Sequence, residues 1–404
     1  MKNSLGIAST QVGFNLRYDW DGVEHVGREG QFPQFTVFFH NRQALRAVQL
    51  NPELGFGEGY MRGEIEVYGV DGQPTDLRDV IRVYFRVRGN FTTWAKLRAW
   101  PSLRWWAFKS WFNANTPARA RRQIPAHYDH PQAVYDHMLD ETKSYSCAYF
   151  ERWGRESLAE AQRAKIDGVC RKLDLQPDDN FLDVGCGRGG LLFHAVEYYR
   201  VKGYGITLSK NQFEWAQREI VRRGLKDRCW VYLTDWRELR GLPPVFDKIS
   251  SLGQFEHVGH WYSQKFCRAM YDRLADGGRF LLHTIVKHKP SPPSPFTMKY
   301  IFPGGEIPYD ANVYRWLQRA GFYLRHAQCF GTYYHMTLSR WYDNFQRNWG
   351  KIRPSITGRD PEQFKRMWEF YLAGAQISFE EDHHDLLQCL VTKGKPDKPI
   401  VGIF

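Results

Sequence analysis

An apolar strand pattern that runs directly into a glycine-rich phrase constrains the fold of this chain most. Residues 180–184 read Asn-Phe-Leu-Asp-Val, residues 185–190 read Gly-Cys-Gly-Arg-Gly-Gly, and a helical pattern follows. Glycines at such a junction let the backbone approach a ligand, and the amino terminus of a helix favours negatively charged groups. The junction therefore predicts a cofactor site at the carboxyl end of a strand. A tight structural turn is the alternative.

Helix and strand patterns alternate from about residue 126 onward. Helical periodicity over 158–173 precedes the strand at 180–184, and further strand patterns cover 201–206, 230–233, 248–252 and 279–284. This rhythm is typical of a parallel sheet with crossover helices. We predict an α/β fold with a doubly wound, mostly parallel, Rossmann-like sheet over residues 126–404.

Residues 1–88 have a different pattern. Short runs at 35–39, 63–69 and 80–87 are rich in β-branched and aromatic residues and are separated by turn residues, so we expect strands there and a small α+β domain. The glycine-dense phrase 55–63 predicts a turn or a close backbone approach.

The formal charge of +12 is concentrated between these two regions. Residues 82–122 contain ten Lys or Arg and five Trp but no Asp or Glu. The spacing of Trp105, Phe108, Trp111 and Phe112 predicts a helix, and prolines 117 and 125 break the pattern, so 89–125 is interpreted as helix and linker. Such a segment suits an anionic membrane surface, a single-stranded nucleic acid, or a connector whose tryptophans pack inward.

Composition excludes several classes of protein. Residues 1–17 lack a signal-peptide pattern, and no run approaches the roughly 18 apolar residues of a membrane span, so we expect a cytoplasmic protein. The seven cysteines form neither a CxxC pair nor a regular framework. Disulfides and a metal site are therefore not expected, and the thiols should be reduced and mostly buried.

The next two strand ends help to identify the cofactor. A dinucleotide site would place a carboxylate after the second strand, but residues 205–212 read Gly-Ile-Thr-Leu-Ser-Lys-Asn-Gln. Together with Asp183 and the GxGxG spacing, this favours S-adenosylmethionine (SAM). Asp235 and Trp236, after the third strand, fit the amino group and face of an adenine, although Trp236 could equally be a core residue.

Several phrases together resemble the cyclopropane fatty acid synthase family. They are Tyr-Ser-Cys-Ala-Tyr-Phe at 145–150, the strand-end phrases above, Gln-Phe-Glu-His-Val-Gly at 254–259, Leu-His-Thr-Ile at 282–285, Ile-Phe-Pro-Gly-Gly-Glu at 301–306 and Tyr-His-Met-Thr-Leu at 334–338. Gly-Glu-Gly-Tyr-Met-Arg-Gly-Glu at 57–64 looks like the extra domain of the long bacterial synthases. The resemblance covers nearly the whole chain.

The resemblance implies a class I SAM-dependent methyltransferase fold and ring closure on an unsaturated phospholipid acyl chain, with a bound bicarbonate ion as the base. It further implies a peripheral membrane enzyme at the inner face, a homodimer, an N-terminal domain for lipid binding or dimerisation, and no nucleic-acid partner. The residues that match the bicarbonate site are Cys147, Glu256, His283, Ile285 and Tyr334. The residues predicted to hold SAM, from the resemblance and the strand ends together, are Tyr145, Ser146, Asp183, Gly185, Gly187, Gly189, Thr207, Leu208, Ser209, Gln212, Asp235 and Trp236.

Taken alone, two of these residues have ordinary explanations. Glu256 could be a helix N-terminal charge and His283 a satisfied core histidine. Cys147 has no base close in sequence, so its backbone or small size is the expected contribution. A carboxylate beside bicarbonate is repulsive unless one of them carries a proton, so we predict a shared proton.

Some positions depart from the family pattern. Residues 130–133 replace a Gly-Asn-Asp phrase that usually follows 127–129, Gln254 stands where Met is usual, and a late Cys is replaced within 372–375. These changes leave open an acyl C-methyltransferase that forms a methyl-branched or methylated product, or a small-molecule N-methyltransferase. An RNA methyltransferase is disfavoured because Gly-Gln-Phe-Glu-His-Val-Gly stands where Asn-Pro-Pro-Tyr would be expected.

Overall fold

The computed structural model describes residues 4–8, 10–111, 115–121, 130–289, 291 and 293–395. The chain divides into two compact units: unit 1 comprises Met1–Phe112, Pro292–Ile301 and Trp341–Asp382, and unit 2 comprises Asn113–Ser291, Phe302–Arg340 and His383–Phe404. This division differs from the predicted segments 1–88, 89–125 and 126–404, because the basic helix and two later segments join unit 1. The predicted boundary at 125/126 and the motif at 127–129 lie outside the described residues.

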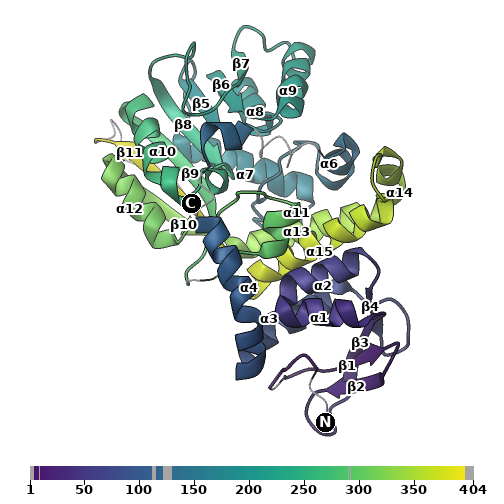
Figure 1. Ribbon diagram of the computed structural model, residues 1–404. Helices are drawn as coiled ribbons and strands as arrows, with labels where there is room; N and C mark the ends of the chain where they lie inside the picture. Colours follow the sequence, from purple (N-terminus) through teal and green to yellow (C-terminus); the bar gives the residue numbers. More distant parts are fainter. Residues whose placement is uncertain are drawn as a thin grey trace. The chain divides into compact units, whose positions relative to one another are not determined.

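Unit 2 is built on a seven-stranded sheet with the order β10-β11-β9-β8-β5-β6-β7 (Figure 1). Strand β11 runs antiparallel to β9 and β10, whereas the pairs formed among β9, β8, β5, β6 and β7 are parallel. The strands are β5 (Asn180–Val184), β6 (Lys202–Thr207), β7 (Cys229–Leu233), β8 (Phe246–Leu252), β9 (Leu274–Val286), β10 (Phe322–Cys329) and β11 (Asp385–Lys393).

Helices cover both faces of this sheet. Side chains of α7 (Leu158–Leu173), α8 (Gly190–Tyr199) and α9 (Lys210–Arg222) share one buried cluster with Phe181 of β5. The next residue, Leu182, joins the opposite cluster with α10 (His260–Arg273) and α12 (Asp310–Ala320). This alternation confirms the doubly wound, mostly parallel fold. Shorter or peripheral helices are α6 (Gln132–Met138), η2 (Phe255–His257) and α13 (Gly331–Arg347), the last of which continues into unit 1.

Unit 1 is the predicted smaller α+β domain. Its sheet has the order β2-β1-β3-β4, in which β1 and β3 are parallel and the other pairs antiparallel. Its elements are β1 (Gly13–Tyr18), β2 (Gly22–Val26), β3 (Pro33–Phe39), α1 (Arg42–Leu50), α2 (Pro52–Met61), β4 (Ile65–Gly69), α3 (Leu77–Val87), η1 (Arg88–Asn90), α4 (Thr93–Trp111), α11 (Pro295–Tyr300), α14 (Trp349–Ile352), η3 (Arg353–Ser355) and α15 (Pro361–Glu380).

The predicted strand at 80–87 is wrong, because this segment belongs to helix α3. The side chain of Asp76 caps the first turn by accepting the N–H of Arg78, and Arg82 forms an ion pair with Glu380 at the end of α15. The β-branched composition favoured a strand, but the cap and a helical spacing of apolar residues prevail. The buried residues of α3 are Leu77, Val80, Ile81, Val83 and Val87.

The glycine-dense phrase 55–63 is not a turn, since residues 52–61 form helix α2 behind the Asn51 cap. The predicted close backbone approach is confirmed. A Cβ on Gly55 would lie 2.2 Å from the carbonyl carbon of Ala47 in α1, and a Cβ on Gly57 would lie 2.5 Å from the ring of Phe296. The glycines therefore let α2 pack closely against its neighbours.

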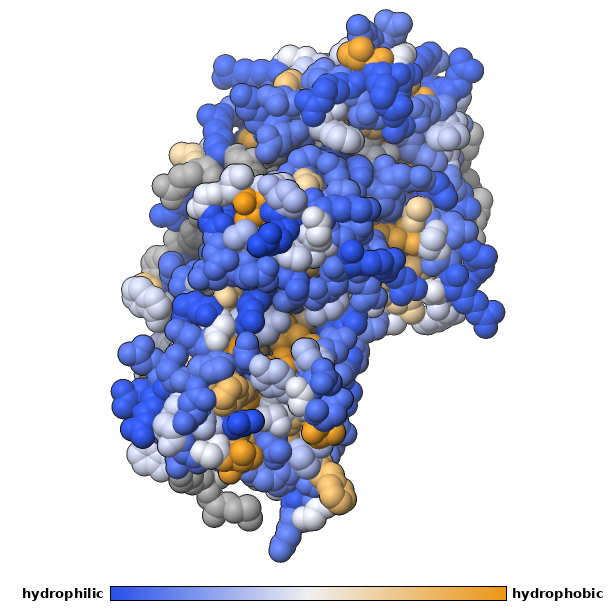
Figure 2. Space-filling model, turned by 90° about the vertical axis from the view of Figure 1, so that its right-hand side faces the viewer, coloured by the Kyte–Doolittle hydropathy of each residue, from blue (hydrophilic) through white to orange (hydrophobic). Residues whose placement is uncertain are grey.

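The predicted helix in the basic segment is confirmed as α4. Within the described part of the chain, no helix combines the length and hydropathy that a bilayer span requires. The face drawn in Figure 2 is mostly hydrophilic, with apolar side chains in separate small patches. All seven cysteines are free thiols and only Cys329 is exposed, as expected.

Candidate cofactor and catalytic site

The loop between β5 and α8 has a backbone that only glycine adopts easily. Gly185, Gly187 and Gly189 have φ values of 81°, 56° and 86°. A Cβ on Gly185 would lie 2.7 Å from Cβ of Gln254, whereas one on Gly187 would meet no atom within 4 Å. Helix α8 starts without a side-chain cap, so its first N–H groups remain available to a ligand.

The polar residues after β6 bind one another. The hydroxyl of Thr207 donates to Oε1 of Gln212 (2.8 Å) and accepts the N–H of Ser209 (3.1 Å), while Oγ of Ser209 caps α9 by accepting the N–H of Gln212 (3.3 Å). All three are buried and Leu208 is half-buried. These contacts fix the shape of the second strand end.

The third strand end presents an incompletely satisfied carboxylate. Oδ1 of Asp235 accepts the N–H of Arg237 (2.9 Å), while Oδ2 is inaccessible and has no hydrogen-bond partner among the described residues. Burial raises the pKa of Asp235. Trp236 is buried against Phe266, with ring centroids 5.2 Å apart, and the guanidinium of Arg237 lies 4.8 Å from its ring centroid. Trp236 is thus also part of the core.

Asp183 is positioned inside the sheet. Its Oδ1 accepts the hydroxyl of Ser250 in β8 (2.7 Å), and burial raises its pKa to about 6. This bond ties together the two strands that end at the glycine loop and at Glu256.

Ser146 is held by a buried lysine that sequence reasoning missed. Nζ of Lys165 donates to Oγ of Ser146 (2.8 Å), and Nε2 of Gln162 donates to the carbonyl of Ser146 (2.8 Å). Burial lowers the pKa of Lys165 to about 8. Tyr145 packs edge-on against Tyr135, with centroids 5.7 Å apart. The helical spacing of Gln162 and Lys165 on a buried face of α7 was the available signal.

Glu256 lies in η2, just beyond the end of β8. Its Oε1 accepts the N–H of Ile285 (2.7 Å), while Oε2 is inaccessible and has no hydrogen-bond partner among the described residues. Burial raises the pKa of this carboxyl to about 7. The N–H of Glu306 donates to the Glu256 carbonyl (2.8 Å), so the phrase at 301–306 helps to position η2.

His283 lies in β9 and is buried. Its Nδ1 faces Nε2 of Gln388 in β11 at 3.3 Å, and its Nε2 is inaccessible and unpaired within the described ranges. Burial, with Lys165 and Lys172 as nearby cations, lowers the pKa of His283 to about 3. The imidazole is therefore neutral at physiological pH.

Cys147, Ile285 and Tyr334 belong to one apolar cluster with Phe330. Burial raises the pKa of the Cys147 thiol well above its usual range, and its Sγ lies 3.9 Å from Oγ1 of Thr337. A protonated thiol in apolar surroundings is a poor nucleophile, in agreement with a role for size or backbone.

The structure connects all five residues that match the bicarbonate site. Ile285 links the apolar cluster to Glu256 through its N–H, and the ring of Phe330 lies 5.6 Å from that of His283. They come from η2, β9, α13 and the loop before α7, and they meet because parallel strands end at one edge of the sheet.

The orphaned polar atoms fit the predicted ligands. Inaccessible Oδ2 of Asp235, at the third strand end, fits an amino group, as SAM requires at its adenine. Oε2 of Glu256 and Nε2 of His283 fit a small ligand that both donates and accepts hydrogen bonds, as bicarbonate does. Ile285 is an exception, because its N–H is taken by Glu256.

Two of the family departures contact the glycine loop. Gln254 packs on Gly185, and Oε1 of Gln132 accepts from Nη2 of the buried Arg188 (2.8 Å). Both departures therefore lie beside the candidate cofactor loop.

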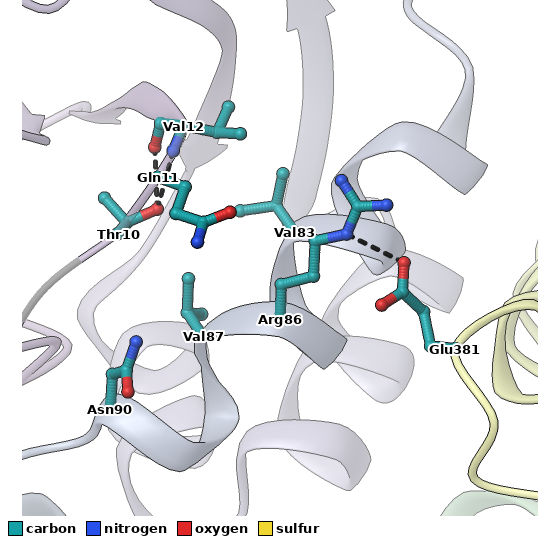
Figure 3. A pocket seen from close by; sticks show the side chains of 8 residues that line it. All are labelled: Thr10, Gln11, Val12, Val83, Arg86, Val87, Asn90 and Glu381. Atoms are coloured by element: carbon teal, nitrogen blue, oxygen red, sulfur yellow. Dashed lines mark hydrogen bonds and ion pairs between the residues drawn. The ribbon is translucent and has the colours of Figure 1, made fainter.

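A separate cavity of about 320 Å³ lies in unit 1 (Figure 3). Arg86 and Glu381 both line it, and Arg86 donates to Glu381 (2.7 Å). None of the predicted site residues lines this cavity. Among the residues that the structure describes, no cluster of His, Cys, Asp and Glu is arranged to hold a metal ion.

The comparisons with known proteins match the N-terminal region and the predicted α/β region separately. Residues 115–389 match the family described as mycolic acid cyclopropane synthetase, and residues 7–96 match a domain of unknown function (DUF7884). A probable fatty acid methyltransferase of Pseudomonas putida is 32% identical, with 94% of this chain and 91% of that protein covered. The cyclopropane-fatty-acyl-phospholipid synthase of Escherichia coli K12 is 34% identical, with 88% and 87% covered.

A solved structure is similar as well. The mycolic acid cyclopropane synthase CmaA1, complexed with SAH and CTAB, is 34% identical and has a TM-score of 0.62. The alignment covers 68% of this chain and 98% of that one.

Proposed function

Because the chain belongs to the mycolic acid cyclopropane synthetase family and is a SAM-dependent methyltransferase, we propose that it converts unsaturated phospholipid acyl chains into cyclopropane acyl chains. The observation that carries this proposal is the connected set of Glu256, His283, Ile285, Cys147 and Tyr334 at the carboxyl edge of the sheet. The lipid class is taken from the name of the Escherichia coli relative, a cyclopropane-fatty-acyl-phospholipid synthase.

When bound, SAM supplies an electrophilic methyl carbon and bicarbonate supplies a proton acceptor. Together they would supply the chemistry of methyl transfer to the alkene, with the C–S electron pair left on sulfur, and of ring closure, with one proton of the transferred methyl passing to the bicarbonate. Methyl transfer to an alkene leaves a carbocation, which water would trap. The apolar cluster around Cys147 and Phe330 would exclude that water.

Glu256 and His283 would hold and orient the proton acceptor. At physiological pH the neutral His283 has one ring N–H to donate, and Glu256, whose pKa is about 7, exchanges between acceptor and donor. A proton shared between Glu256 and the bound anion removes the repulsion of two adjacent negative charges.

A product without a ring is the second candidate, favoured by the 32% identity to a probable fatty acid methyltransferase. Lipids from vesicles incubated with enzyme and SAM distinguish the two when mass spectrometry is combined with proton NMR of the vinyl hydrogens. Ring closure adds one CH2 and removes the alkene, whereas a methylated alkene has the same mass and keeps its double bond. A product that keeps its alkene, or that carries a saturated methyl branch, would overturn ring closure.

We also propose that α4 binds the anionic bilayer that contains the substrate. Trp94, Leu97, Trp105 and Phe108 recur at helical spacing and are exposed to between 55% and 79%. On the other side of the helix, Ala99 is buried. The apolar stripe therefore faces solvent, although the sequence left open whether the tryptophans pack inward.

Charge favours an anionic surface as the partner of this stripe. Lys96, Arg98, Arg104 and Lys109 lie on the same helix, which contains no acidic residue, and the guanidinium of Arg104 lies 4.7 Å from the ring centroid of Trp100. Rings beside cations suit the headgroup region of a bilayer. The predicted inner-face location and homodimer remain expectations.

Sedimentation with vesicles of saturated phosphatidylglycerol and phosphatidylcholine tests this surface without turnover. The double variant Trp94→Ala/Trp105→Ala should lose at least about tenfold in affinity. The variant Phe32→Ala, which truncates an aromatic residue that is 88% exposed in unit 1, should bind as the native protein does. Equal binding by all three proteins, or a preference for single-stranded RNA over vesicles, would reject α4 as the membrane contact.

A further inference from the structure

A row of polar side chains crosses three neighbouring strands beside the candidate site. His283 in β9 pairs directly with Gln388 in β11, and Gln388 pairs directly with Gln328 in β10. Nζ of Lys172, in the last turn of α7, donates to Oε1 of Gln388 (2.6 Å) and to Oε1 of Gln328 (2.9 Å). The row ends at the imidazole whose role in the mechanism depends on where its proton lies.

The ammonium group of Lys172 fixes the orientation of the Gln388 amide. An ammonium group only donates hydrogen bonds, so the Gln388 atom that it contacts must be the oxygen. The NH2 group of Gln388 is then directed at Nδ1 of His283, at 3.3 Å. Rotating the amide by half a turn would place its NH2 group against the ammonium group, which would then keep only Gln328 as an acceptor.

This orientation determines the histidine tautomer. An amide NH2 group only donates, so Nδ1 must accept and carries no proton. The single proton of the neutral ring then lies on Nε2, which is inaccessible and has no hydrogen-bond partner among the described residues.

We infer that Lys172 and Gln388 are positioning residues that hold His283 as its Nε2–H tautomer, so that His283 donates a hydrogen bond in the site and does not act as a base there. This inference rests on the proposed function in one respect: the acceptor of the hydrogen bond from His283 is taken to be the bound anion. A histidine held this way binds an anion but cannot remove a proton, which assigns proton removal to the bound anion.

The variant Gln388→Glu tests the inference while keeping the contact with Lys172. A carboxylate accepts on both sides, so the His283 proton should move to Nδ1 and leave Nε2 as an acceptor. The matched control is Gln328→Glu, which places the same charge on Lys172 but does not contact His283 through the cross-strand pair. Lys172→Met is a third variant, which frees the Gln388 amide to rotate.

Nitrogen-15 NMR of the full-length protein labelled at histidine reads the tautomer directly, and His283→Gln identifies the signals. We expect Nε2–H in the native protein and in Gln328→Glu, Nδ1–H in Gln388→Glu, and a mixture in Lys172→Met. Turnover of Gln388→Glu should fall about 10- to 100-fold, as is common when the partner of a functional histidine is changed, with the SAM dissociation constant unchanged.

Two outcomes would overturn the inference: Nδ1–H in the native protein, or an unchanged tautomer in Gln388→Glu. Both readings are independent of any lipid product. A native protein that shows the Nε2–H tautomer but forms no cyclopropane would instead reject the proposed function.

Discussion

Replacing Glu256 with Gln tests whether this carboxyl holds a proton near neutral pH. Its Oε2 is inaccessible and unpaired among the described residues, and burial raises its pKa from 4.5 to about 7. At about 1.4 kcal/mol per pKa unit, this shift corresponds to at most about 3 kcal/mol of unfolding free energy.

The sign follows from the protons bound in each state. Below pH 4.5 the carboxyl is protonated in both states and has no effect on stability. Between 4.5 and about 7 the folded protein keeps a proton that the unfolded chain has lost, so this group lowers stability as pH rises. Above about 7 the penalty of the buried charge is complete.

Denaturant unfolding of both proteins from about pH 5 to about pH 8 measures the effect. Since Gln does not titrate, Glu256→Gln should gain up to about 3 kcal/mol relative to the native protein across this range. Glu151→Gln, which changes an exposed carboxylate of unit 2, should show no such trend. A difference that stays constant within about 0.5 kcal/mol would mean that Glu256 is ionised throughout and that the shared proton is absent.

Two further predictions concern packing and cofactor binding. Gly57→Ala places a Cβ 2.5 Å from the ring of Phe296 and should destabilise unit 1 by about 1–3 kcal/mol in thermal unfolding. The control Gly374→Ala, in helix α15, meets no atom within 4 Å and should stabilise unit 1 by about 0.5–1 kcal/mol. Equal shifts in the two variants would contradict the close packing of α2. Lys165→Met removes the donor to Ser146 and should weaken SAM binding about tenfold by calorimetry. Unchanged affinity would show that Ser146 is positioned without it.

Local patterns predicted the fold of unit 2 well. Strand β5 and helix α7 begin and end at the predicted residues, because an apolar run with a glycine stop and a capped amphipathic stretch are both local signals. Residues 80–87 show the opposite case. Their β-branched composition pointed to a strand, whereas arginines at 78, 82 and 86 repeat every four residues, and each has an acidic partner that lies more than 260 residues away in sequence.

The same contrast between local signals and long-range contacts applies to the site. Its residues could be predicted from the sequence, but their roles could not. His283 could be found from a phrase in the sequence, but its donor role depends on Gln388, 105 residues later, which meets it only through the register of β9 and β11. A shift of one residue in that register would turn Gln388 to the opposite face of the sheet. Lys172 then decides which end of the amide faces the imidazole. Residue identity is therefore local in this site, while proton position is a property of the whole sheet.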